Sequence, residues 1–142
     1  MKRFFWDRNK VFVVVDEDVG LKNTAVYFNG EKIDKSHAIG GKLGERGKVV
    51  LGLLLLNNAE PLSSNQIQEY IEDVYNEDCN YQSVFRAVSN IRTSFWGKDL
   101  GKKFISPETI DEKEGSVIGY SIHFIEVSSL FKTDYNDEEY SI

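Results

Sequence analysis

The chain has few of the residues that build crosslinked or membrane-spanning proteins. Among its 142 residues Cys79 is the single cysteine, which excludes an internal disulfide and favours a reducing, cytoplasmic setting. The acidic residues beside Cys79 do not favour a reactive thiolate. The apolar run at residues 49–56 is eight residues long, whereas a membrane helix needs about 18. The basic N-terminal segment lacks the long apolar region of a signal peptide.

The sequence also has little of the chemistry that catalytic and metal sites need. Its two histidines, His37 and His123, fall in different predicted elements. With Cys79 they would form a nucleophile and its base only if folding happened to bring them together. No spaced cluster of cysteines and histidines is present, so a zinc site is not indicated. We therefore expect no enzyme, no metal and no cofactor.

One glycine-rich segment, residues 41–48, partly matches a phosphate-binding loop. The motif requires four residues between its first glycine and the Gly-Lys pair, followed by Ser or Thr. Here five residues separate Gly41 from Gly47, and Val49 stands in the hydroxyl position. Nucleotide hydrolysis is therefore a weak alternative.

An overall excess of basic charge is missing as well, because the net charge is −6, which by itself argues against nucleic-acid binding. Residues 1–59 carry ten basic and seven acidic residues, residues 60–79 six acidic and no basic ones, and residues 107–142 nine acidic against two basic. Residues 80–106 carry five basic residues against one acidic. These five are Arg86, Arg92, Lys98, Lys102 and Lys103. Such a local basic segment is the electrostatic footprint of phosphate binding.

The apolar patterns predict one domain of the α+β class, residues 1–127, followed by an acidic extension at 128–142. The β-branched run at 11–15 and the segment at 25–28 read as strands. Asn29-Gly30 is typical of a two-residue hairpin turn, with a return strand at 31–33. The first forty residues therefore form a small antiparallel sheet, and the glycines that follow mark its boundary.

Three helices are predicted after the sheet. The first, at about 45–56, is apolar on so many sides that it must be buried. Ser63 and Gln66 form a capping box at the start of the second, which repeats apolar residues with helical spacing. Those residues are Ile67, Tyr70, Ile71 and Val74. A polar loop at 76–80 precedes the third helix, which is expected to end at about residue 95.

The third predicted helix is the most informative segment. Val84, Val88, Ile91 and Phe95 form an apolar stripe at spacings of four, three and four. Outside the stripe lie Gln82, Arg86, Ser89, Asn90 and Thr93, residue types that bind base edges and phosphates. An ordinary amphipathic helix is the alternative interpretation. A short strand at 104–106, a charged loop at 107–116 and a long strand at 117–125 complete the predicted domain.

Several segments, taken in order, carry a resemblance to a known family. Residues 27–33 match an N-terminal sheet, residues 43–56 match a first helix, and residues 57–71 match a turn and second helix. Residues 83–92 (SVFRAVSNIR) match a recognition helix. The strands of a wing are matched by Ile105 and Gly119-Tyr120-Ser121-Ile122. Over roughly residues 4–125 the chain resembles the OmpR/PhoB-type winged-helix DNA-binding domain. Within that group it is most similar to the ToxR/CadC-type transcription regulators.

The resemblance implies a winged helix-turn-helix whose third helix enters the major groove and whose hairpin wing lies over the adjacent backbone or minor groove. It also implies an RNA-polymerase-contacting loop at about 75–82 and binding to promoter DNA as a dimer or tandem pair. ToxR/CadC-type regulators often continue into a membrane helix. The chain could thus be the cytoplasmic part of an inner-membrane regulator, or act with a membrane-bound partner.

Nine residues are the candidates for DNA contact: Gln82, Arg86, Ser89, Asn90, Arg92, Thr93, Lys98, Lys102 and Lys103. Arg86 and Asn90, one turn apart, are expected to contact bases. Gln82 lies at the helix start, where recognition helices enter the groove. Arg92 is expected to hold a phosphate or to pair with a carboxylate inside the protein. For the remaining residues, phosphate binding competes with a simple solvated surface.

The chain departs from the family in the charge of the wing. Residues 107–116 carry four acidic residues and only one basic residue, and the like charge of DNA phosphates would repel them. Thr93 and Ser94 also stand where the family has basic residues. Binding is therefore expected to be weak or salt-sensitive unless dimers or partners contribute. The alternative is an acidic winged-helix interaction module that binds another regulator or polymerase rather than DNA.

Overall fold

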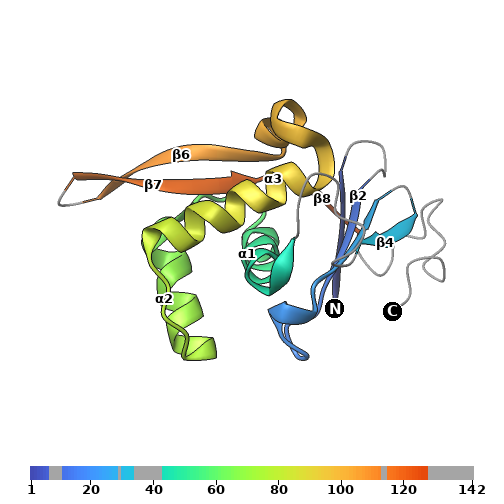
Figure 1. Ribbon diagram of the computed structural model, residues 1–142, viewed down its shortest axis with the longest axis horizontal. Helices are drawn as coiled ribbons and strands as arrows, with labels where there is room; N and C mark the ends of the chain where they lie inside the picture. Colours follow the sequence, from blue (N-terminus) through green and yellow to red (C-terminus); the bar gives the residue numbers. More distant parts are fainter. Residues whose placement is uncertain (7–10, 29, 34–42, 113–114, 128–142) are drawn as a thin grey trace.

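A computed structural model shows an α+β fold (Figure 1). Its described residues form a five-stranded antiparallel sheet, a three-stranded antiparallel sheet and three α-helices. The structure describes residues 1–6, 11–28, 30–33, 43–112 and 115–127, with the backbone alone for 28, 31, 33, 93–104 and 112. The predicted acidic extension at 128–142 lies outside these residues. The elements in chain order are β1 (Lys2–Trp6), β2 (Val11–Val15), the 3₁₀ helix η1 (Leu21–Asn23), β3 (Ala25–Phe28), β4 (Glu31–Ile33), α1 (Gly44–Leu56), β5 (Leu62–Ser63), α2 (Ser64–Tyr75), α3 (Tyr81–Phe104), β6 (Ile105–Glu112), β7 (Gly115–Ile122) and β8 (Ile125–Val127).

The larger sheet has the order β4-β3-β2-β1-β8. It confirms the three predicted strands and the hairpin between β3 and β4, in which Gly30 has a φ of 85° that favours glycine. Val11 and Val13 on β2 face the main core, while Phe12 and Val14 lie on the opposite face of the sheet and are also buried. This burial on both faces explains why β2 is a continuous apolar run rather than an alternating one.

Strand β1 was not predicted from the sequence. It pairs antiparallel with β2 on one side and with β8 on the other. Only Phe4 among its five residues is fully buried. A strand with basic residues at its start and partial burial gives a weak local pattern. Its partners are supplied by segments before and after the helices, which no local pattern reveals.

Helix α1 occupies the centre of the core, as its apolar composition predicts. It contacts η1, α2, α3, β2 and β7, so apolar residues on nearly all of its sides are buried. Gly52 lies where α1 meets η1, and an ideal Cβ there would be 2.7 Å from Thr24 Oγ1. Glycine therefore permits the close approach of the helix to the turn.

The capping box at the start of α2 is confirmed. Ser63 Oγ accepts a hydrogen bond from Gln66 N at 3.1 Å, and Gln66 Oε1 accepts one from Ser63 N at 2.9 Å. Ile67 and Ile71 are buried, but Val74 at the end of the predicted stripe is 55 % exposed. Val74 thus lies on the solvent side of the last turn, whereas Tyr75 in the same turn packs against the core. The helix is capped by Asn76, which adopts a left-handed conformation.

Helix α3 is longer than predicted. It begins after Asn80, whose side chain accepts a hydrogen bond from Ser83 N at 2.9 Å, and it continues to Phe104 instead of ending near residue 95. Val84, Val88 and Ile91 are fully buried, which confirms the described part of the apolar stripe. The prediction of the helix end was wrong because a single glycine such as Gly97 costs only about 1 kcal/mol in a helix and does not terminate it.

The prediction of a charged loop at 107–116 was also wrong, because β6 and β7 pair from Ile105↔Ile122 out to Glu112↔Gly115. In Figure 1 this hairpin projects beyond the helices. β6 is an edge strand in the order β5-β7-β6. Pro107, which lacks an N–H, is tolerated on such an edge. Polar strands of this kind are recognised from their partner rather than from their own composition.

The predicted strand at 117–125 is interrupted at His123 and Phe124, where the chain passes from one sheet to the other. Asn58 donates from Nδ2 to the Phe124 carbonyl at 2.6 Å and accepts from Phe124 N at 2.7 Å. Ala59 N donates to the Ile122 carbonyl at 2.7 Å. These bonds satisfy backbone groups that have left the β7 ladder, and β8 then joins β1 in the larger sheet.

Candidate nucleic-acid interface

The N-terminal half of α3 presents a polar surface opposite its buried stripe. Gln82, Arg86 and Ser89 follow one another at helical spacing, and Gln82 and Arg86 are exposed while Ser89 is half-buried. Within the described residues, the Arg86 guanidinium makes no hydrogen bond or ion pair. Thr93 continues the same line, but its side chain is outside the described residues. The structure thus places one cation on this face with its hydrogen-bonding capacity unused by the fold.

Arg86 and Asn90, the predicted base-contacting pair, meet at a hollow of about 260 Å³ between α3 and the start of α1. Glu45 and Arg46 of α1 and Ser83 of α3 line it as well. Asn90 is half-buried there, so its amide lies deeper than Arg86. The two predicted residues are brought to one site, with the arginine more accessible than the asparagine.

An aromatic pair that was not predicted from the sequence lies on the other flank of this polar surface. The rings of Tyr81 and Phe85 stack with centroids 6.5 Å apart and an interplanar angle of 23°. They are 43 % and 54 % exposed. Phe85 lies one helical turn from Tyr81 and outside the apolar stripe. An aromatic residue outside the stripe is the sequence signal that could have identified this pair.

Arg92 is committed to the junction between α3 and the hairpin. Its Nη2 donates to the Ile105 carbonyl at 2.8 Å, and its guanidinium carbon lies 5.9 Å from the centre of the Tyr120 ring. Burial lowers the pKa of Arg92 and raises that of Tyr120, to which Tyr81 also contributes. Pairing with a carboxylate inside the protein was one of the two expectations for Arg92. Its partner in the structure is instead the backbone carbonyl of Ile105, so Arg92 joins α3 to β6.

Lys98, Lys102 and Lys103 lie on the C-terminal half of α3. The prediction that the third helix ends near residue 95 would place them after the helix. That prediction was wrong, because α3 continues to Phe104. Their side chains are outside the described residues, so their contact with phosphate remains a prediction.

The hairpin adds negative charge beside this surface. Glu108 Oε1 accepts a hydrogen bond from the buried Ser121 hydroxyl at 2.7 Å, and Asp111 Oδ1 accepts one from Ser116 at 3.0 Å. These bonds hold the two carboxylates on the β-strands. A hairpin with this charge would be repelled by DNA phosphates, as its sequence predicts.

The loop between α2 and α3 is tied to α1 and η1 by an ion-pair network around Glu77. Glu77 Oε1 lies 2.8 Å from Lys22 Nζ, and Oε2 lies 3.1 Å from Arg46 Nη2. Arg46 also donates to the Asp78 carbonyl at 3.3 Å. The hydrogen bond from Lys22, followed by that from Arg46, lowers the pKa of Glu77, and Glu77 in turn raises the pKa of Lys22.

We expect Glu77→Gln to lower the free energy of unfolding modestly at neutral pH, because it removes the charge that Lys22 and Arg46 share. The folded-state pKa of Glu77 is depressed, so its contribution is present above the pKa of the unfolded chain and is lost as the pH falls through the lower folded value. Urea unfolding at a series of pH values should therefore show the two proteins converging in acid. Glu72→Gln on the exposed side of α2 is the matched control; equal losses in the two variants would contradict the network.

The residues of the enzymatic alternative show no reactive arrangement among the described positions. Cys79 is buried and its Sγ faces the Asn80 carbonyl at 3.9 Å; burial raises the pKa of the thiol. His123 is exposed, with Nε2 3.5 Å from the Ser121 hydroxyl, and His37 is outside the described residues. Across the described ranges, His, Cys, Asp and Glu side chains form no group of three or more that could hold a metal ion.

Comparison of the chain with protein-family models, with curated proteins and with solved structures finds no match. None of the helices in the described part of the chain is long and apolar enough to cross a membrane. The site is therefore interpreted from its own geometry and chemistry.

Proposed function

We propose that this protein is a winged-helix transcription regulator that reads duplex DNA with α3 and acts without catalysis. The observation that carries the proposal is the exposed Arg86, which has no hydrogen-bond or ion-pair partner among the described residues. It lies on a helix whose other side is anchored in the core by Val84, Val88 and Ile91. A rigid helix that presents an arginine and other polar side chains suits the major groove.

The order of elements supports the same function. Helices α2 and α3 follow one another across a short loop, and a hairpin follows α3 after the helical core. This is the order expected of a helix-turn-helix with a wing, in which the second helix of the motif is the reading helix. In this arrangement Gln82 and Arg86 lie in the part of α3 that would enter the groove first.

The charge distribution makes the proposed binding weak for a single copy. The exposed side of α2 carries Glu69, Glu72 and Asp73, and the hairpin carries further carboxylates. Few phosphates would be neutralised, so affinity depends on joining two weak contacts as a dimer or tandem pair. The loop held by Glu77 is the proposed contact for RNA polymerase, and a cytoplasmic location follows from this function.

The second candidate is an acidic module that binds another regulator. The exposed Tyr81–Phe85 stack favours it, because aromatic side chains are enriched in protein interfaces, and so do the acidic hairpin and α2. Arg86, which has no partner within the described part of the chain, favours DNA instead, since arginine commonly contacts guanine in the major groove.

Selection from a pool of random duplex DNA across a salt series separates the two candidates. Enrichment of one sequence motif supports the regulator, and its loss in an Arg86→Ala/Asn90→Ala variant assigns the reading to α3. Lys2→Ala, an exposed cation on β1, is the control and should retain the motif. Absence of binding even at low salt would favour the protein-interaction module.

For Arg86→Ala alone we expect specific binding to weaken by about 1–3 kcal/mol and the preference at one base position to relax. Both effects follow from the loss of a bidentate contact to a base. Binding titrations of the selected duplex and of variants changed at each position measure them. A loss of equal size on every sequence would make Arg86 a phosphate contact.

A further inference from the structure

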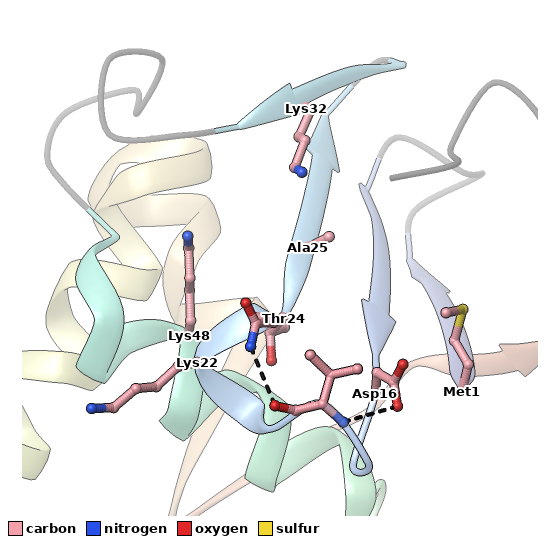
Figure 2. Close-up of a pocket in the computed structure, with 9 residues that line it drawn as sticks. Met1, Asp16, Lys22, Thr24, Ala25, Lys32 and Lys48 are labelled. Carbon is pink, nitrogen blue, oxygen red and sulfur yellow. Dashed lines mark hydrogen bonds between the residues drawn. The ribbon is translucent and has the colours of Figure 1, made fainter.

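A second hollow, of about 360 Å³, lies beside α1 and shares no lining residue with the hollow at Arg86 and Asn90. Figure 2 shows residues that line it. Residues of η1, β3, β4 and α1 contribute to its lining, with Val19 and Met1 adding apolar surface. None of the residues that line it belongs to α3. Its volume is at the lower end of the range for small-molecule pockets, about 300–1,000 Å³.

Three lysines from three different elements line this hollow: Lys22 of η1, Lys32 of β4 and Lys48 of α1. The Lys22 ammonium is occupied by Glu77 at 2.8 Å and Glu45 at 3.9 Å, and Figure 2 shows it turned away from the other two. Lys32 and Lys48 extend from opposite sides towards the space between β4 and α1 (Figure 2). Among the described residues, neither has a hydrogen-bond or ion-pair partner.

Among the described residues that line this hollow, Asp16 is the only acidic one, and it does not supply a counter-charge to Lys32 and Lys48. Asp16 Oδ1 accepts hydrogen bonds from the N–H groups of Asp18 at 3.1 Å and Val19 at 3.4 Å, within its own turn. In Figure 2 Asp16 lies at the opposite end of the hollow from Lys48. An anionic group in the hollow would therefore be attracted to the lysines and repelled from the Asp16 end, which fixes its orientation.

The neutral polar groups of the lining are already used by the fold. Asn23 Nδ2 donates to the Val19 carbonyl at 3.4 Å, and the Thr24 hydroxyl donates to the Leu21 carbonyl at 2.6 Å. Recognition would then depend on the two ammonium groups, which act as compact charges with several donors each. Ala25 and Val19 leave room for an apolar body beside the charged group.

We propose that the hollow between β4 and α1 binds a small organic anion with at least two negative charges, held by Lys32 and Lys48. Phosphoryl and carboxylate groups share this chemistry. The site is independent of the proposed DNA-binding surface. It joins α1 to the larger sheet, so its occupation would stabilise the folded chain.

The test uses the full chain with pyrophosphate and citrate as probes, at constant ionic strength, by isothermal titration calorimetry and thermal unfolding. We expect saturable binding of at least one probe and a rise of several degrees in Tm. In Lys32→Gln/Lys48→Gln the affinity should fall at least about tenfold, since both charges that hold the probe are removed. Lys2→Gln should bind like the unchanged protein.

The probes separate the sources of the anion. Binding of pyrophosphate alone indicates a phosphoryl ligand, and binding of citrate alone indicates a polycarboxylate. The proposal is overturned if neither probe saturates the site, if the double variant binds as well as the unchanged protein, or if sodium chloride at the same ionic strength gives the same rise in Tm. Circular dichroism of the double variant shows whether it is folded, and single lysine variants replace it if it is not.

Discussion

Gly119→Ala is expected to lower the free energy of unfolding by about 1–3 kcal/mol, the usual cost of overpacking a filled site. An ideal Cβ at Gly119 would lie 2.4 Å from the Leu62 carbonyl oxygen and 2.4 Å from Ile110 Cδ1. The carbonyl belongs to the backbone of β5, which pairs with β7 at Leu62↔Tyr120 and Ser63↔Gly119. Relief would require β5 to move away from β7 and would disturb the Ser63 cap of α2.

Urea unfolding followed by circular dichroism measures this loss, and Gly47→Ala is the matched control. At Gly47 the nearest atom to an added Cβ is Leu43 Cδ1, at 3.0 Å, which is the end of a flexible side chain. Alanine is also favoured over glycine by about 1 kcal/mol inside a helix. We expect Gly47→Ala to be neutral or stabilising; a Gly119→Ala protein as stable as this control would contradict the close β5–β7 contact.

Ile91→Ala is expected to cost about 2–5 kcal/mol, the range for truncating a buried isoleucine. Ile91 is fully buried in the main core. Its Cγ1 would lie 3.9 Å from a Cβ at Gly47, so it packs between α3 and α1. A cavity here loosens the anchoring of the helix that carries Arg86, and we expect DNA affinity to fall with stability.

Ile118→Ala removes the same atoms from a position on the hairpin that is 47 % exposed. Its effect on unfolding should stay within about 0.5 kcal/mol, as is usual for surface substitutions. Thermal and urea unfolding of both variants give the comparison. Similar losses in the two proteins would show that α3 is not anchored through Ile91, and would weaken the proposal of a rigid reading helix.

The acidic surface of the protein is compatible with the proposed recognition helix if sequence specificity matters more than the affinity of a single copy for DNA. Phosphate contacts supply most of the non-specific affinity for DNA, whereas base contacts supply the sequence preference. A copy with few phosphate contacts would bind random DNA weakly and would depend on a second copy or a partner at its target. The proposed anion site adds a separate place where a small molecule could influence stability.

The candidate site could be read in part from sequence. Arg86 and Asn90 were paired by helical spacing alone, and the structure brings both to one hollow. Arg92, on the same helix, turns instead to the Ile105 carbonyl. The exposed Tyr81–Phe85 pair was missed, because the burial of an aromatic residue depends on what packs against its side of the helix, and the sequence does not state that.

Features whose causes lie within a few residues of one another could be predicted from the amino-acid sequence. The Ser63–Gln66 capping box, the buried stripe at Val84, Val88 and Ile91, and the hairpin at Gly30 depend on local hydrogen bonds, helical periodicity and backbone conformation. Each of these is encoded in neighbouring residue types, so each was predicted correctly.

Features that need partners far apart in the chain could not be predicted in this way and were found only in the folded protein. The pairing of β7 with β5, the passage through Phe124 fixed by Asn58, and the pairing of β1 with β8 all join segments that are distant in sequence. The Glu77 network and the hollow at Lys32 and Lys48 arise in the same way. Their energies come from contacts that exist only after the chain has folded, and for that reason local patterns do not contain them.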